Sequence, residues 1–144
     1  MNAMKTEIAF WDTSAALPLC CSQIFTTQSK KWLRKYPKIV VWWGTSVEIS
    51  SGLARLKRDG HLTDKETIKA LRLWEKLRKT CRIVSPVERV IELANDLPAH
   101  YGLRALDSFQ LAALVWCQEK PRRRPFVTTD ERLAKAGFNE VLLT

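Results

Sequence analysis

The sequence predicts an α/β protein in which a central, mostly parallel sheet lies between two layers of helices. Short, almost wholly apolar runs alternate along the chain with segments that have a helical period. One of these runs, Ile39–Trp43, is apolar at every position, so both faces of that strand must be covered. Such alternation, with right-handed crossovers, is typical of a three-layer α/β/α domain whose ligand sites lie at the carboxyl ends of the strands.

Strands are expected where the apolar runs are too short to form a helix of ordinary length. Bulky side chains occur throughout, with only five glycines and six prolines to interrupt them, which argues against disorder. In chain order the expected strands are Ile8–Trp11, Ile39–Trp43, Ile83–Val84, Phe126–Val127 and Val141–Leu143.

Helices are expected in the gaps between these runs. The best marked of them begins at Thr63, which forms a capping-box pattern with Glu66. Apolar residues follow on one stripe at helical spacing, namely Ala70, Leu73, Trp74, Leu77 and Cys81. The other expected helices are Ser14–Cys21, Thr26–Tyr36, Thr45–Arg58, Val87–Tyr101, Leu106–Glu119 and Glu131–Ala136.

Length and composition predict a single globular domain over residues 1–144. Of the 144 residues, 46% are hydrophobic, which is enough for one core. The longest apolar run, Leu111–Cys117, is far shorter than the roughly 18 residues of a membrane span, and the first residues lack the apolar stretch of a secretory signal. We therefore expect a cytoplasmic protein with no membrane partner. The four cysteines show no C-x-x-C spacing, so neither structural zinc nor disulfides are expected.

The charge of the chain indicates a class of partner. The 24 Lys and Arg residues against 15 Asp and Glu give a formal net charge of +9. On so small a domain this charge attracts polyanions, nucleic acid first and anionic lipid second. The same residues can equally serve to solvate helix faces, so the charge alone leaves both interpretations open.

Four acidic residues fall where a sheet of this kind binds ligands. Asp12 and Asp130 each follow an expected strand. Glu48 lies near the start of the helix after Ile39–Trp43, with small residues beside it, and Asp107 opens an apolar helix. Taken singly, Asp12 fits an Asx turn, and Asp107 and Asp130 fit helix N-caps. Taken together, the four carboxylates are expected to meet at one edge of the sheet.

Four converging carboxylates would need a cation to hold them together. At an effective dielectric constant near 20, neighbouring carboxylates within about 5 Å repel by roughly 3 kcal/mol. An all-oxygen ligand set selects a hard cation, Mg²⁺ or Mn²⁺, which keeps water and bridges to phosphate oxygens. Such a site activates a bound water for in-line attack and needs no histidine. The residues therefore favour phosphoryl chemistry.

Four segments, taken in order, resemble the PIN-domain ribonucleases, and more narrowly the VapC-like toxins of bacterial type II toxin–antitoxin modules. They are Phe10–Ala15, Thr45–Ile49, Leu103–Ala112 and Val127–Leu133. The resemblance extends over essentially the whole chain. It implies a PIN-like α/β/α fold, cleavage of RNA with Mg²⁺ or Mn²⁺, a homodimer, and a cognate antitoxin that occupies the active-site groove.

The same resemblance implies roles for individual residues. It assigns metal binding and catalysis to the acidic set Asp12, Glu48, Asp107 and Asp130. Ser14 and Thr128 match the hydroxyl positions that support this set by hydrogen bonding. Two features depart from the family pattern, Pro18 after the first motif and the bulky Trp42–Trp43 pair, and both concern packing rather than chemistry.

Two arginines are candidates for substrate binding. Arg104 lies three residues before Asp107, and Arg132 lies two residues after Asp130, so both place guanidinium donors where a phosphate backbone would pass. Salt bridges onto the same acids are the alternative. Within the basic segment Lys120–Pro125, residues Arg122–Arg124 are further candidates for phosphate contact, and a merely solvated loop is the alternative.

Other functions compete with a nuclease. A PIN-fold domain with an idle site, which binds RNA or an antitoxin without cutting, is the alternative that the residues leave open. A haloacid dehalogenase-type phosphatase needs a second acid two residues after the first, where Ser14 stands. A phosphate-receiver domain needs adjacent acids near its first strand, and Glu7 and Asp12 do not provide them.

Overall fold

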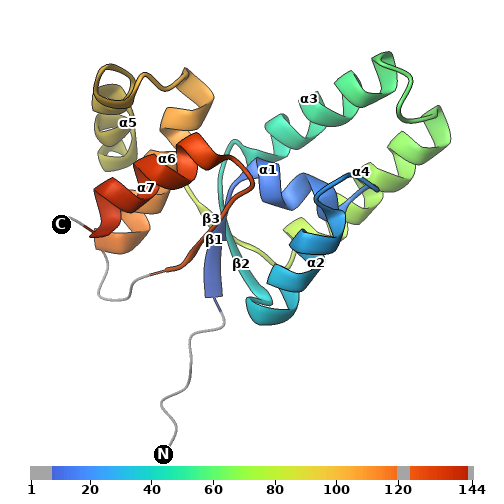
Figure 1. The fold of residues 1–144 in the computed structure, drawn as a ribbon, viewed down its shortest axis with the longest axis horizontal. Coiled ribbons are helices and arrows are strands. Elements are labelled where there is room, and N and C mark those ends of the chain that lie inside the picture. The colour runs from blue at the N-terminus through green and yellow to red at the C-terminus, as the bar shows by residue number, and fades with distance from the viewer. Residues whose placement is uncertain (1–7, 120–123, 143–144) are drawn as a thin grey trace, which may run out of the picture.

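A parallel sheet forms the centre of the molecule. The computed structural model describes residues 8–119 and 124–142 (Figure 1). Its strands are β1 (Ile8–Trp11), β2 (Lys38–Trp42), β3 (Arg82–Val84) and β4 (Phe126–Val127). They pair in the order β3-β2-β1-β4, and each pairing is parallel. This confirms the expected α/β/α fold with a central parallel sheet.

Helices cover both faces of this sheet. Figure 1 shows α5, α6 and α7 on one side and α2, α3 and α4 on the other. In chain order they are α1 (Thr13–Ala16), the 3₁₀ turn η1 (Leu17–Leu19), α2 (Thr26–Lys35), α3 (Thr45–Arg58), α4 (Asp64–Arg78), α5 (Glu88–Tyr101), α6 (Ala105–Glu119) and α7 (Glu131–Leu142). None of the helices in the described ranges combines the length and the apolar character that a membrane crossing requires.

The core consists of two apolar clusters, one on each face of the sheet. Successive residues of a strand point to opposite faces, so Phe10 and Val40 pack in one cluster while Trp11 and Val41 pack in the other. The first cluster lies beneath α5, α6 and α7, and the second lies beneath α1, α3 and α4. Burial on both faces is the reason that β1 and β2 are apolar at consecutive positions.

Two expected elements differ in the structure. The helix expected over Ser14–Cys21 is instead the short α1 followed by η1, because Pro18 has no backbone N–H to continue the α-helical ladder. The strand expected at Val141–Leu143 is wrong, since α7 extends to Leu142; residue 143 lies outside the described residues. Val141 lies eight positions after Leu133, so it continues the helical period, and a short apolar run does not by itself distinguish strand from helix.

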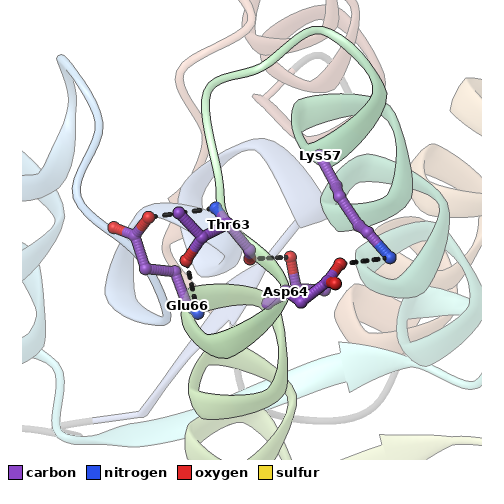
Figure 2. Close-up of polar contacts among 5 residues, drawn as sticks. Lys57, Thr63, Asp64 and Glu66 are labelled. Atoms are coloured by element: carbon purple, nitrogen blue, oxygen red, sulfur yellow. Dashed lines mark hydrogen bonds and ion pairs between the residues drawn. The ribbon is translucent and has the colours of Figure 1, made fainter.

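The hairpin of α3 and α4 projects away from the sheet (Figure 1), and side-chain contacts hold its tip (Figure 2). Thr63 Oγ1 accepts from the Glu66 N–H at 3.1 Å, and the Thr63 N–H donates to Glu66 Oε1 at 3.0 Å, which confirms the capping box (Figure 2). Lys57 Nζ lies 2.7 Å from Asp64 Oδ1 and joins the two helices beside it. Gly60 turns the chain with a φ of +79°, a conformation that glycine adopts without strain.

Replacing Thr63 with Ala is expected to lower the free energy of unfolding by about 1 kcal/mol, because the first turn of α4 loses its cap. Thr63→Ser keeps the hydroxyl acceptor and serves as the matched control. Urea unfolding of the parent and the two variants measures the difference. Equal stability of the parent and the Ala variant would show that the capping box contributes nothing at this exposed tip.

Candidate active site

The four acids of the sequence analysis line one cavity at the carboxyl ends of the strands. Asp12 follows β1, Asp130 follows β4, and Glu48 and Asp107 lie in the first turns of α3 and α6. The cavity they share has a volume of about 280 Å³. A larger hollow of about 450 Å³ lies beside η1, α2 and α4, and the carboxylate that lines it, Glu66, belongs to the capping box. The structure thus brings together the acids that the sequence singled out.

Asp12 is held by hydroxyl groups from both ends of the chain. Its side chain caps α1, where Oδ1 accepts from the Ala15 N–H at 3.2 Å and from Ser14 Oγ at 2.7 Å. Thr128 Oγ1 donates to Oδ2 at 2.5 Å. Ser14 Oγ also accepts from the Thr129 N–H at 2.9 Å, which ties the end of β1 to the end of β4. Asp12 is therefore both a helix cap and a member of the acidic cavity.

Asp130 is likewise both a helix cap and a member of the acidic cavity. Its Oδ1 accepts from the Leu133 N–H at 3.1 Å, the geometry of an N-cap on α7, and its own N–H donates to Thr128 Oγ1 at 3.0 Å. Thr128 consequently contacts two of the four acids. The capping role explains why this carboxylate is fixed in place, and its second oxygen is not used by the cap.

A buried amide holds Glu48. Gln110, on α6, is 2% exposed, and its Nε2 lies 3.0 Å from Glu48 Oε2. The same nitrogen lies 3.1 Å from Thr13 Oγ1 and 3.1 Å from Thr45 Oγ1. Gln110 was not among the predicted site residues, although a glutamine in the otherwise apolar stretch of α6 was a usable signal.

Basic side chains border the cavity. Arg132 Nη2 lies 3.7 Å from Asp107 Oδ2, with 68% of the arginine side chain and 28% of the aspartate side chain exposed. This is the salt-bridge alternative for Arg132, and its exposure leaves the guanidinium open to a ligand as well. Arg55, from α3, lines the cavity and was missed because it reads as an exposed residue of a helix face. Of the basic segment Lys120–Pro125, positions 120–123 lie outside the described residues.

Burial makes ionisation of these acids costly. Burial raises the pKa of Asp12 to about 6 and that of Glu48 to about 7, and in each case a neighbouring carboxylate adds a smaller upward contribution. The pKa of Asp107 is also raised, by burial first and by Asp130 second, while the charges of Arg132 and Arg104 oppose the shift. Desolvation, more than mutual repulsion, is thus the main cost of keeping the cavity charged.

The donor set suits a hydrated divalent cation better than one enclosed by protein. In the described ranges, no three His, Cys, Asp or Glu side chains converge into a ready-made ligand group. Both oxygens of Asp12 already accept hydrogen bonds, as does Oε2 of Glu48. Mg²⁺ commonly keeps several waters and binds through one or two carboxylates, which this oxygen-lined cavity provides. Gln110 Oε1, buried without a hydrogen-bond partner among the described residues, adds an unused acceptor on a residue that lines the cavity.

Comparison with known proteins agrees with this architecture. The model of the family described as PIN domain matches residues 9–139. A solved toxin–antitoxin complex from Klebsiella pneumoniae is 20% identical, with a TM-score of 0.57 over 85% of this chain and 86% of that chain. VapC20 of Mycobacterium tuberculosis, described as a sarcin-ricin loop cleaving toxin, is 21% identical, with a TM-score of 0.66 over 93% and 98%.

No curated protein gives a significant match to the chain. At identities this low, the two solved structures show a shared fold. The family model extends over most of the chain, from β1 through most of α7, and so includes each strand and each acid of the cavity. The chain therefore belongs to the PIN domain family of nucleases.

Proposed function

We propose that the chain is a metal-dependent endoribonuclease that acts as the toxin of a toxin–antitoxin pair, working as one domain over residues 1–144. The observation that carries this proposal is the cavity at the carboxyl edge of a PIN-fold sheet, lined by Asp12, Glu48, Asp107 and Asp130. RNA as the substrate is supported by the charge of +9 and by the fold shared with a toxin described as cleaving the sarcin-ricin loop.

In this proposal the acidic cavity would hold a hydrated Mg²⁺ or Mn²⁺ through one or two of its four carboxylates. The bound ion would supply an activated water and neutralise charge on the leaving oxygen. Ser14 and Thr128 donate to Asp12, so that this carboxylate keeps one orientation. Arg132 and Arg104 bind the phosphate backbone beside the acids and offset the repulsion between an anionic substrate and an acidic cavity.

RNA cleavage by the purified protein is expected to require Mg²⁺ or Mn²⁺ and to stop in EDTA. Thiol alkylation is expected to leave it largely intact, since the four cysteines lie outside the acidic cavity and burial raises the pKa of Cys20 to about 12 and that of Cys117 to about 11. End-labelled RNA resolved on gels measures both effects. Cleavage that persists in EDTA contradicts the metal mechanism, and binding without cleavage under any metal supports the idle-site alternative, in which Asp12 and Asp130 are caps alone.

The two arginines beside the acidic cavity, Arg104 and Arg132, are expected to determine the affinity for RNA. Neutralising Arg104 and Arg132 together, each to Gln, should weaken binding and reduce the slope of log affinity against log salt by roughly one for each phosphate that the variant no longer binds. The single variants Arg104→Gln and Arg132→Gln are compared with Lys65→Gln, which removes one positive charge from the first turn of α4 at the hairpin tip. Fluorescence anisotropy of labelled RNA across salt concentrations makes the comparison. An unchanged slope in the double variant would show that these arginines are solvated surface residues that do not bind phosphate.

The proposal includes two protein partners, a cognate antitoxin and a second copy of this chain. The shared fold with a chain of a toxin–antitoxin complex supports the first. Large apolar side chains exposed on α4, Ile68 and Leu71, offer a surface for a protein partner. Light scattering of the purified chain, alone and co-expressed with the product of a neighbouring reading frame, tests both partners.

A further inference from the structure

We infer that Gln110 is a positioning residue that fixes the Glu48 carboxylate in the cavity and thereby sets its affinity for a divalent cation. The inference rests on the proposed function and assigns a role to a residue outside the acidic set. It follows from three features of Gln110: the atoms around its amide nitrogen, the elements it joins, and the cost of its burial.

The amide nitrogen of Gln110 faces three oxygens at hydrogen-bond distance. They are Glu48 Oε2 at 3.0 Å, Thr13 Oγ1 at 3.1 Å and Thr45 Oγ1 at 3.1 Å. An ionised carboxylate only accepts hydrogen bonds, so the opposite amide orientation would set two acceptor oxygens against each other. The orientation with Nε2 toward Glu48 is therefore the one that an ionised Glu48 requires.

These contacts join three separate elements. Thr13 belongs to α1 and follows Asp12 directly, Thr45 and Glu48 belong to α3, and Gln110 lies one helical turn after Asp107 on α6. One side chain therefore links the segments that carry three of the four acids. Rigid placement of this kind is what orients ligands around a metal ion, and the partners of metal ligands commonly change metal affinity or activity 10- to 100-fold when removed, as a rough range.

The burial of Gln110 has a cost that the contacts of its nitrogen must offset. Its Oε1 is buried with no hydrogen-bond partner in the described part of the molecule, and leaving such an acceptor unsatisfied typically costs about 1–3 kcal/mol. The next two residues, Leu111 and Ala112, are fully buried, so the amide is a polar group in an apolar part of the helix. The three contacts of the nitrogen are what hold the amide there, and one of them is to the Glu48 carboxylate.

The test compares Gln110→Met with the parent and with Gln118→Met, in the full-length protein. Methionine has nearly the shape of glutamine but removes the donor and the orphaned oxygen together. Gln118 is a second glutamine of α6, whose side chain bonds to the backbone N–H and C=O of Arg124 away from the acids, so it controls for loss of an amide from this helix. Titration calorimetry with Mn²⁺, RNA cleavage kinetics and thermal melts are the three measurements.

We expect Gln110→Met to stay folded in metal-free buffer, to bind Mn²⁺ about 10- to 100-fold more weakly, and to lose kcat with little change in KM for RNA. Gln118→Met is expected to keep the Mn²⁺ affinity of the parent. If Gln110→Met does not fold, Gln110→Asn, whose amide is too short to reach Glu48, is measured in its place. A folded Gln110 variant with the Mn²⁺ affinity and kcat of the parent overturns the inference.

The outcomes separate this inference from the proposed function. A parent that binds Mn²⁺ but cuts no RNA contradicts the proposed nuclease activity, and the change in Mn²⁺ affinity still decides the role of Gln110. A parent that binds no Mn²⁺ contradicts both. Equal loss of Mn²⁺ affinity in Gln110→Met and Gln118→Met would show that losing either amide of α6 weakens metal binding. That result would overturn the positioning role of Gln110.

Discussion

Replacing Asp12 with Asn is expected to reduce RNA cleavage by roughly 10²- to 10³-fold while the protein stays folded. The change removes one charge from the cavity at nearly constant shape. Asparagine is as good a helix cap as aspartate, so its oxygen can still accept from the Ala15 N–H and Ser14 Oγ, and its amide can donate to Thr128 Oγ1. The Asn variant therefore keeps the capping hydrogen bonds of Asp12 and removes only its negative charge.

The same replacement is expected to stabilise the metal-free protein at neutral pH. Burial raises the pKa of Asp12 from 3.8 to about 6, so the folded state binds a proton more tightly than the unfolded state. The contribution of Asp12 to the stability of the parent is therefore fully present below about pH 4 and is lost as the pH rises through 6, by up to about 3 kcal/mol. The Asn side chain does not ionise, so the free energy of unfolding of the variant should exceed that of the parent at pH 8 but not at pH 4.

Urea unfolding in EDTA at pH 4, 6 and 8 measures this difference, and thermal melts with Mg²⁺ complete the test. Because a ligand stabilises the folded state that binds it, Mg²⁺ should raise the melting temperature of the parent more than that of the variant. Asp59→Asn, at the exposed end of α3, removes the same charge elsewhere and is the control. A variant that unfolds without metal would show that the fold needs the negative charge of Asp12, and a folded variant that still cuts RNA would exclude Asp12 from the active site.

Cleavage is expected to fall steeply below about pH 7 when the divalent ion is scarce, and to recover when the ion is abundant. Burial raises the pKa of Glu48 to about 7, so in the absence of metal this carboxylate is mostly protonated at pH 5.5. A proton and a cation compete for the same carboxylate, hence acid weakens metal binding and metal in turn displaces the proton. At limiting metal, we expect the rate at pH 5.5 to be about tenfold or more below the rate at pH 7.5.

Initial rates from pH 5.5 to 8.5, each at low and high Mg²⁺, test this competition. High Mg²⁺ should move the acidic limb of the profile to lower pH. Glu48→Gln has no proton to lose at this position, so its low residual rate should show a smaller shift of the limb with Mg²⁺. An acidic limb that stays at the same pH at every Mg²⁺ concentration would show that Glu48 is not where metal and proton compete.

Much of this architecture could be predicted because the local signals agreed with the long-range packing. The helix expected at Thr45–Arg58 has those bounds in the structure. The strand expected at Ile39–Trp43 is observed as Lys38–Trp42; its apolar residues are buried on both faces, while Trp43 lies after the strand and is exposed. The acids could be chosen because each follows a strand or opens a helix. Pro18 also carried a signal, but its effect depended on where the helix before it would end.

What could not be predicted depends on contacts between distant segments. Gln110 has partners 62 to 97 residues away in the chain. A glutamine stands out in the apolar stretch of α6, but the sequence does not show which distant residues its amide contacts. The expected strand at Val141–Leu143 failed for a related reason, since a short apolar run forms a strand only where a neighbouring strand is available to pair with it. Spacing alone does not supply that information.

The hydroxyl contacts around Asp12 have a consequence for the order of folding. Thr128 and Asp12 are 116 residues apart, and β1 pairs directly with β4, so this end of the sheet forms only after nearly the whole chain has been brought together. The α3–α4 and α5–α6 hairpins, by contrast, close short loops and can form early. Substitutions at the β1–β4 junction should therefore speed unfolding more than they slow folding, and late intermediates should possess their helices before they possess a complete acidic cavity.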